Sequence, residues 1–387
     1  MNNDGYALGS ISAKQFLADY WQKKPLLIKQ ALPDFINPLS PEEIAGLACE
    51  DFAESRLITE SSASPKWQLK HGPFAEADFL ALPDADWTLH VQGIERFFPD
   101  VYALLDGFRF IPNWRVDDIM VSYSPDKGTA GPHFDQYDVF LMQGLGKKHW
   151  RVGQHCDADT ALLPDCDLSI LTDFETQDEW IVEPGDVLYI PPGIAHYGVA
   201  VGDSITYSVG FRAPSHGDLL GEFSHYLTDS LQEDQRYSDP DLTLQNNPGE
   251  ISPSALAKVQ KILADTLNDP AKLARWFGEY MTEPKQQEVG YEFEAIQTAE
   301  QLVEELVQVE TLCWVEGCRC AWFAQQDSLD LFVNGKRYSC DLSLKKLLQL
   351  ISESTRINSS KLLKLIDSKN GKQLMFDLFN DGYFYFD

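Results

Sequence analysis

The chain has 387 residues, and at about 100–200 residues per domain this length predicts two or three domains. Hydrophobic residues make up 44% of the chain and charged residues 24%, which is ordinary globular composition and excludes a disordered or collagen-like protein. Lysine and arginine number 31 against 60 aspartates and glutamates, so the formal net charge is −29, which opposes direct binding to nucleic acid or to an anionic membrane.

The N-terminus does not have the pattern of a secretion signal, and no apolar run approaches the roughly 20 residues that a membrane span needs. We therefore expect a soluble, cytoplasmic protein. Its seven cysteines are odd in number and form no Cys-x-x-Cys pair, which favours reduced structural thiols over a zinc site.

Residues 1 to about 115 combine short helical and strand patterns. One helix is predicted within SAKQFLADYWQKKP, which ends at a proline, and a second begins at Ser40, which precedes a proline and two acidic residues. From about 116 to 212 the pattern changes to closely spaced strands separated by glycine, proline and aspartate turns. Many short strands of this kind predict a sandwich or a barrel.

From about 216 to 285 the apolar residues recur at helical spacing, with further runs at about 252–266 and 270–281. These amphipathic helices can pack internally or against a second subunit, and the sequence alone favours neither. The stretch 283–291 is predicted to be a linker.

The remainder, from about 292 to 387, is predicted to be a small α+β domain. Helices are expected over 294–308, near 343–353 and near 359–367, with strands at 311–315, 329–340 around an Asn-Gly turn, and 382–386. Two helices followed by a terminal β element suggest a winged-helix shape. A DNA-reading version should be strongly basic, and this segment is not.

Three histidines precede an acid by two residues, in the pairs His133 and Asp135, His155 and Asp157, and His216 and Asp218. Non-haem iron(II) oxygenases hold their metal with two histidines and one carboxylate, so each pair is a candidate. The first pair is predicted to begin an apolar strand, where residues i and i+2 point to the same face. The second lies in an acidic, loop-like stretch, and the third fits the first turn of a helix.

His196 is the candidate for a third ligand, because it follows a strand and a rigid Pro-Pro-Gly turn in EPGDVLYIPPG. A turn-capping His196 and a satisfied core His133 fit the residues equally well. In KKHWRV, alternation places Lys148 on the inward face with its apolar neighbours. We interpret this buried lysine as the partner of a 2-oxo dicarboxylate, although an acidic neighbour would serve equally well.

The segments GPHFDQYDVFLMQGLGKKHWRVG, EPGDVLYIPPGIAH and YSVGFRAP together resemble the JmjC-type 2-oxoglutarate oxygenases. The resemblance is specifically to the bacterial ribosomal oxygenases that hydroxylate an arginine of the large-subunit ribosomal protein numbered sixteen. It extends upstream through WQKKPLLIK and HGPF. It implies an α+β fold, in which a double-stranded β-helix is followed by a helical dimerisation segment and a winged-helix-like domain. The implied ranges are 1–214 for the catalytic domain with its N-terminal α/β extension, 215–285 for the dimerisation segment and 286–387 for the winged helix.

The same resemblance implies the cofactors and the site residues. The implied roles are iron(II) ligation by His133, Asp135 and His196, binding of the cosubstrate 2-oxoglutarate by Lys148 and Ser122, and contact with the substrate arginine by Asp118, Met120, Tyr137 and Ser208. A guanidinium is best matched by a carboxylate, and its stem packs on a thioether or an aromatic ring. The implied reaction is hydroxylation of the arginine β-carbon (C3) in a basic ribosomal protein, carried out by a homodimer.

Two alternatives remain at this stage. A JmjC-type hydroxylase or demethylase of another basic protein shares every iron and cosubstrate residue. A non-catalytic, cupin-like binding protein belongs to a different class, and its metal would serve structure. The open ligand triad opposes this second alternative, because structural metal sites usually close their coordination with a fourth protein ligand.

Overall fold

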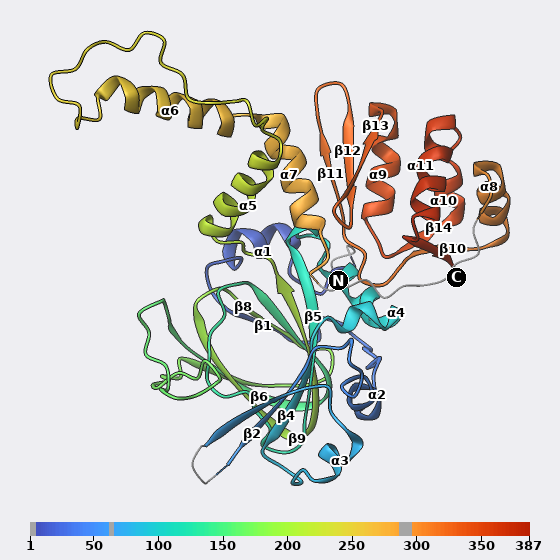
Figure 1. The fold of residues 1–387 in the computed structure, drawn as a ribbon. Helices are drawn as coiled ribbons and strands as arrows, with labels where there is room; N and C mark the ends of the chain where they lie inside the picture. Colours follow the sequence, from blue (N-terminus) through green and yellow to red (C-terminus); the bar gives the residue numbers. More distant parts are fainter. Residues whose placement is uncertain (1–4, 62–65, 286–295) are drawn as a thin grey trace.

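The computed structural model describes residues 5–61, 66–285 and 296–387. In Figure 1 a barrel-like sheet forms the lower part of the molecule, a helical segment lies above it, and a smaller α+β unit lies at the upper right. The α+β class predicted from the sequence is confirmed. No helix in the described ranges is long and apolar enough to cross a membrane.

The sheet is antiparallel, and its strand order is β1-β8-β6-β9-β5-β4-β2-β3, with β7 paired to β6. Its strands are β1 (Leu26–Ile28), β2 (Ser55–Glu60), β3 (Trp67–His71), β4 (Trp87–Val91), β5 (Val116–Ser124), β6 (Val139–His155), β7 (Asp178–Val182), β8 (Val187–Ile190) and β9 (Ile194–Phe211). The two longest strands, β6 and β9, pair with each other along most of their length. On its other edge β6 pairs with β8, and on its other edge β9 pairs with β5. The predicted barrel of strands is thus present, with fewer and longer strands than the turn signals indicate.

The short helices of the first 115 residues pack around the sheet. They are α1 (Ala13–Asp19), α2 (Pro41–Leu47), α3 (Glu76–Leu80) and α4 (Pro99–Tyr102), with 3-10 turns η1 (Ile94–Arg96), η2 (Ala103–Phe108) and η3 (Asn113–Arg115). Both predicted helices are confirmed. The hydroxyl of Ser12 caps α1, and Ser40 and Glu43 form a reciprocal capping box at α2, which satisfies backbone donors that a helix start leaves unpaired.

The strand predicted to begin at His133 is a correction, because β6 begins only at Val139. Residues 133–138 form a loop whose single β-bridge joins His133 to His196. The fully buried Asp138 fixes the end of this loop, since its carboxylate accepts hydrogen bonds from Tyr189 (2.6 Å), Gln22 (2.9 Å) and Arg115 (3.2 Å). These side-chain bonds hold the loop, so a regular backbone ladder forms only beyond Asp138.

The helical segment consists of α5 (His216–Asp229), α6 (Pro253–Leu267) and α7 (Pro270–Thr282), as the helical spacing predicts. Helices α5 and α7 pack on each other through Phe223, Leu227 and Trp276. Helix α6 extends away from the rest of the molecule at the upper left of Figure 1, and none of its residues is buried. Its apolar face therefore has no partner within the described chain.

The C-terminal unit contains two small sheets and four helices within its described residues. Its elements are α8 (Ala299–Gln308), β10 (Thr311–Trp314), β11 (Cys320–Ala324), β12 (Leu329–Val333), β13 (Lys336–Cys340), η4 (Leu342–Leu344), α9 (Lys345–Ser352), β14 (Arg356–Asn358), α10 (Ser359–Leu363), α11 (Lys369–Asn380) and β15 (Phe384–Phe386). The Asn-Gly hairpin between β12 and β13 is confirmed, and both of its turn residues have positive φ. Most of the predicted linker, 286–291, lies outside the described residues.

Helix α11 was not predicted. Its sequence begins with Lys369-Asn370-Gly371, which resembles a turn, yet Ser368 caps it through the amide of Gly371 (3.0 Å). Buried Leu374 and Leu378 then hold the helix against the core, so tertiary packing outweighs the local glycine signal.

The C-terminal unit contacts the large sheet at the start of β5, next to Asp117. Asp117 forms ion pairs with Arg212 at the end of β9, with Lys285 after α7 and with Arg319 of the C-terminal unit. On the other side of the junction, Asp106 accepts hydrogen bonds from the amide and hydroxyl of Thr355. The start of β5 is thus held by cations from three separate segments.

Candidate active site

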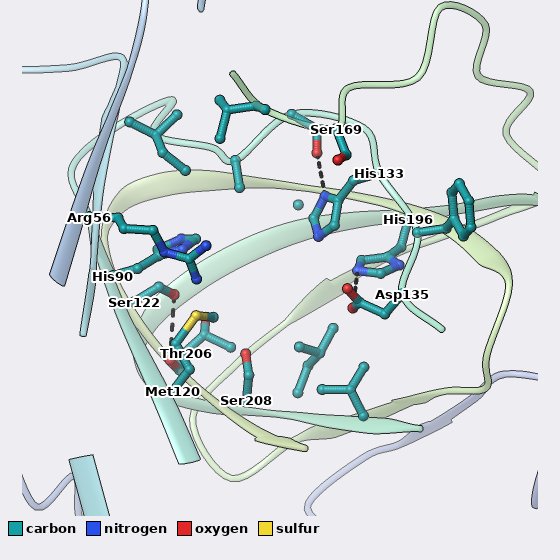
Figure 2. A pocket seen from close by; sticks show the side chains of 18 of the residues that line it. Arg56, His90, Met120, Ser122, His133, Asp135, Ser169, His196, Thr206 and Ser208 are labelled. Carbon is teal, nitrogen blue, oxygen red and sulfur yellow. Dashed lines mark hydrogen bonds and ion pairs between the residues drawn. The ribbon is translucent and has the colours of Figure 1, made fainter. Parts of the chain in front are cut away.

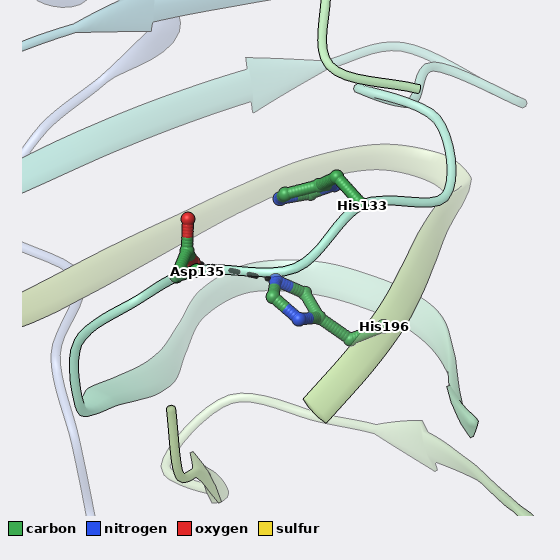
Figure 3. A group of neighbouring side chains, drawn as sticks. All are labelled: His133, Asp135 and His196. Atoms are coloured by element: carbon green, nitrogen blue, oxygen red, sulfur yellow. Dashed lines mark ion pairs between the residues drawn. The ribbon is translucent and has the colours of Figure 1, made fainter. Parts of the chain in front are cut away.

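His133, Asp135 and His196 converge inside the barrel mouth, with their ligand atoms all within 4.8 Å of one another (Figure 3). His196 is the third residue of β9, whereas His133 and Asp135 belong to the loop before β6. The two histidines exchange backbone hydrogen bonds of 3.1 and 2.8 Å, which clamps the loop onto the strand. The structure therefore brings together the three residues that the sequence singles out.

Both imidazole rings are oriented by backbone carbonyls. Nδ1 of His133 lies 2.8 Å from the carbonyl of Gly131, and Nδ1 of His196 lies 3.0 Å from the carbonyl of Ile194. A ring that donates from Nδ1 keeps a lone pair on Nε2, so both Nε2 atoms are free to bind a metal. Burial, reinforced by the neighbouring His133, lowers the pKa of His196 to about 4, so this ring stays neutral.

The donor set is two imidazole nitrogens and one carboxylate oxygen. His196 Nε2 lies 3.6 Å from Asp135 Oδ2, a separation that a metal ion between them can bridge. Within the described ranges no further histidine, cysteine or acid joins this cluster, so a bound ion would keep open positions. Two histidines and one carboxylate with open positions are typical of non-haem iron(II) oxygenases.

Lys148 lies on the inner face of β6 and is only 5% exposed. The alternation predicted for KKHWRV is confirmed, because Trp150 and Val152 are buried on the same face. Lys148 Nζ lies 3.5 Å from Ser122 Oγ, and no carboxylate of the described residues is within ion-pair distance of it. The alternative of an acidic neighbour is therefore not supported. Burial lowers the pKa of Lys148 to about 8.

Arg56 and His90 line the same cavity, of about 350 Å³, and sequence reasoning missed both. Strand pairing sets them in a row, because Arg56 lies opposite His90 and His90 lies opposite Ser122 (Figure 2). Burial first, and then the charges of Arg56 and Lys148, lower the pKa of His90 well below its ordinary value, so this histidine is neutral. No sequence signal marks this row, since it depends on the register between β2, β4 and β5.

The four residues assigned to the substrate arginine also line this cavity, namely Asp118, Met120, Tyr137 and Ser208. Met120 on β5 lies directly opposite Ser208 on β9. Asp118 falls in a β-bulge between Val116 and Ile119. A bulge changes the direction in which side chains point. Asp118 therefore lines the cavity, whereas its neighbour Asp117 does not line it and pairs with Lys285.

The electrostatics of Asp118 and Tyr137 follow from their surroundings. Burial, reinforced by Asp117, raises the pKa of Asp118, while a 2.5 Å hydrogen bond from Gln92 lowers it. Tyr137 is 42% exposed, and burial of its hydroxyl together with the charge of Asp135 raises its pKa. An acid of raised pKa, which has no ion-pair partner among the described residues, therefore lines the cavity together with an aromatic ring.

The other two His-x-Asp pairs are not part of the site, as expected. His155 is exposed at the end of β6. Asp218 belongs to the capping box at the start of α5, where its carboxylate accepts from the amide of Ser215 at 2.9 Å. Neither pair belongs to a metal-ligand cluster within the described residues.

Comparison with known proteins gives two family matches, a JmjC domain over residues 103–219 and a ROXA-like winged helix over 265–385. The chain is 33% identical over 378 residues to the ribosomal protein uL16 3-hydroxylase of Escherichia coli, covering 96% of this chain and 97% of that protein. The structure of the E. coli ribosomal oxygenase YcfD in complex with cobalt and 2-oxoglutarate matches with a TM-score of 0.83 and 32% identity, covering 98% of this chain and 99% of that chain.

A more distant similarity is limited to part of the chain. The bifunctional lysine-specific demethylase and histidyl-hydroxylase NO66 of Aedes aegypti is 26% identical over 204 residues, which cover 49% of this chain and 31% of that protein. The two family matches confirm the predicted fold class, a JmjC domain followed by a winged helix.

Proposed function

Because the chain belongs to the family of JmjC-domain ribosomal oxygenases that includes the uL16 3-hydroxylase of E. coli, we propose that it hydroxylates the β-carbon (C3) of an arginine in ribosomal protein uL16. The reaction uses Fe(II) as cofactor and 2-oxoglutarate as cosubstrate. One observation carries the proposal. An open His-Asp-His cluster lies in a cavity that also contains the buried Lys148 and the carboxylate of Asp118, and neither of these charged groups has an ion-pair partner among the described residues.

His133, Asp135 and His196 would hold the metal. When bound, iron(II) activates dioxygen at the expense of 2-oxoglutarate and supplies the oxidising power for hydroxylation of a C–H bond. The chain itself binds the cosubstrate's distal carboxylate with the ammonium of Lys148, assisted by the hydroxyl of Ser122. An anion at this place compensates the buried charge, which is otherwise costly.

The substrate arginine would enter with its guanidinium toward Asp118 and Ser208 and its methylene stem against Met120 and Tyr137. The pairing of guanidinium and carboxylate fixes the far end of the side chain. Orientation then decides which carbon lies nearest the metal ligands, and a fixed guanidinium holds the β-carbon there.

The direct test mixes the purified protein, Fe(II), 2-oxoglutarate and uL16 in air, followed by measurement of the intact mass of uL16. The expected result is the gain of one oxygen atom, dependent on 2-oxoglutarate. Succinate formation without a mass gain would contradict the choice of substrate, and the absence of both would contradict the oxygenase function.

Substitution of Asp118 by asparagine should raise the KM for uL16 by about 30-fold or more, because it removes the charge that pairs with the guanidinium while preserving shape. The KM for 2-oxoglutarate should not change. Steady-state kinetics with each substrate varied in turn checks both values. Asp159→Asn, on an exposed loop away from the cavity, is the matched control. Equal KM values for uL16 in the two variants would remove Asp118 from substrate binding.

We also propose that the protein is a cytoplasmic homodimer assembled through 215–285 and that it does not bind nucleic acid directly. The support for a dimer is the unpartnered apolar face of α6, formed by Leu256, Val259, Ile262 and Leu263, which are 44–59% exposed. Burying such a face against a second copy removes it from water. The ranges 1–214, 215–285 and 286–387 remain our proposed domain division.

If the protein dimerises through α6, a charged residue on the apolar face of this helix should disrupt the dimer. Ile262→Glu should convert the protein to a monomer, since a carboxylate in an apolar interface is strongly disfavoured. Light scattering coupled to size-exclusion chromatography measures the mass directly. Lys261→Glu, on the opposite face of the same helix, should leave the dimer intact. A wild-type monomer at micromolar concentration, or an Ile262→Glu dimer, would contradict the proposed interface.

A further inference from the structure

Gln92 lies between two cavities. It follows β4 directly, and its backbone amide donates to the carbonyl of Glu54 at 2.9 Å, which fixes its main chain. Its side chain lines both the 350 Å³ cavity of the His-Asp-His cluster and a neighbouring cavity of about 280 Å³ at the junction with the C-terminal unit. Asp118 lines both cavities as well.

The amide of Gln92 uses both of its ends. Its Nε2 donates to Asp118 Oδ2 at 2.5 Å, and its Oε1 accepts from Arg56 Nη2 at 3.3 Å. Carboxylates only accept and guanidinium groups only donate, so these two partners fix which way the amide points. Arg56, Gln92 and Asp118 therefore form one hydrogen-bonded chain from β2 to β5.

We propose that Gln92 is the positioning residue for the substrate-binding carboxylate, holding Asp118 Oδ2 through this chain so that Oδ1 faces the incoming arginine. The inference rests on the proposed function, because it takes Asp118 as the partner of the substrate guanidinium. Within the described residues the structure gives Asp118 Oδ1 no hydrogen-bond donor, so this oxygen is available to a ligand.

A carboxylate at this place needs such a restraint. Asp118 lies in a bulge, where regular strand pairing is interrupted, and the adjacent Asp117 is surrounded by the cations Arg212, Lys285 and Arg319. A carboxylate free to rotate could turn toward these cations and away from the cavity. The hydrogen bond from Gln92 Nε2 to Asp118 Oδ2 restrains this rotation.

An amide suits this role better than a cation. A lysine or arginine in place of Gln92 would neutralise Asp118 and compete with the substrate guanidinium. Gln92 orients the carboxylate and leaves its negative charge in place, while the positive charge of Arg56 lies one hydrogen bond further away. The two hydrogen bonds of Gln92 thus restrict the orientation of the Asp118 carboxylate and leave its negative charge available to the substrate.

The test compares Gln92→Met with wild type, since methionine preserves the length of the side chain and removes both hydrogen bonds. The KM for uL16 should rise about ten-fold, while the KM for 2-oxoglutarate and the succinate formed without uL16 stay at wild-type values. A merely structural defect would lower both activities together. Gln154→Met is the matched control, because the side-chain amide of Gln154 also makes two hydrogen bonds, in its case to backbone groups, and Gln154 does not line the cavity.

A double-mutant cycle tests the chain itself. Arg56→Met should raise the KM for uL16 less than Gln92→Met does, and the double variant should match Gln92→Met, because Arg56 acts on Asp118 only through the amide. If the two substitutions raise the KM for uL16 additively, Arg56 does not act through Gln92, and the proposed row of hydrogen bonds is wrong. If Gln92→Met fails to fold, Gln92→Leu replaces it, since it also removes both hydrogen bonds and adds no charge.

Different results would contradict the proposed function and the role of Gln92. A wild-type enzyme that leaves uL16 unmodified overturns the proposed function, and this inference with it. Wild-type hydroxylation combined with an unchanged KM for uL16 in Gln92→Met overturns the role of Gln92 alone.

Discussion

Replacing Asp135 with alanine is expected to abolish 2-oxoglutarate turnover, by about a thousand-fold or more, while the protein stays folded. Asp135 supplies the only carboxylate among the three clustered ligand residues, so two imidazoles would remain to hold a divalent ion. Its side chain is 23% exposed and belongs to a loop outside the apolar core, so its removal leaves no buried gap. Succinate release measures the activity, and thermal unfolding measures the stability.

The chain provides a matched control for this variant. Asp157 also follows a histidine by two residues, and it lies in an exposed loop outside every metal-ligand cluster of the described residues. Asp157→Ala should therefore turn over at the wild-type rate. Normal turnover in Asp135→Ala would exclude the three clustered residues as the metal site.

Replacing Lys148 with alanine should raise the KM for 2-oxoglutarate by about 100-fold with a smaller effect on kcat. The change removes the buried ammonium group beside Ser122, and with it a charge-assisted contact to the distal carboxylate. Lys147→Ala is the control, because Lys147 points outward on the same strand and pairs with Glu183 at 2.6 Å. An unchanged KM in Lys148→Ala would mean that another group holds the cosubstrate.

The lowered pKa of Lys148 also leads us to expect that cosubstrate binding depends on pH. Burial lowers the pKa of Lys148 to about 8, so above this pH the empty site holds a neutral amine. The charged form binds the carboxylate, so the KM for 2-oxoglutarate should rise as the pH increases from about 8 to 9.5. A KM that falls over this range would contradict the assignment of Lys148 as the cation.

Local sequence signals predicted the parts of the fold that depend on neighbours in the chain. The helix start at Ser40, the Asn-Gly hairpin and the alternation around Lys148 are all confirmed, because each depends on residues within a few positions. The start of β6 was misplaced because it is fixed by Asp138, whose partners lie 23 to 116 residues away along the chain. Helix α11 was missed because packing outweighs its glycine.

In the candidate site, too, residues marked by local sequence patterns could be predicted, and residues placed by contacts between distant strands could not. His133 and Asp135 could be selected by their spacing, although the strand predicted to hold them is a loop, and Lys148 could be selected by the alternation of its strand. His196 could be selected because it follows a strand and a Pro-Pro-Gly turn. Arg56, His90 and Gln92 could not, since they reach the cavity only through the pairing of β2 with β4 and of β4 with β5. Register between distant strands depends on tertiary packing, and a one-residue slip would turn these side chains away from the cavity.

The central claim is that this cavity selects an arginine and exposes its β-carbon to the metal site. The most direct measurement is fragmentation mass spectrometry of uL16 after reaction, followed by hydrolysis and comparison of the modified amino acid with a 3-hydroxyarginine standard. We predict one added oxygen, on the β-carbon of an arginine, that is lost in Asp118→Asn at limiting uL16. An oxygen on a histidine, or loss of a methyl group from a lysine, would contradict the account.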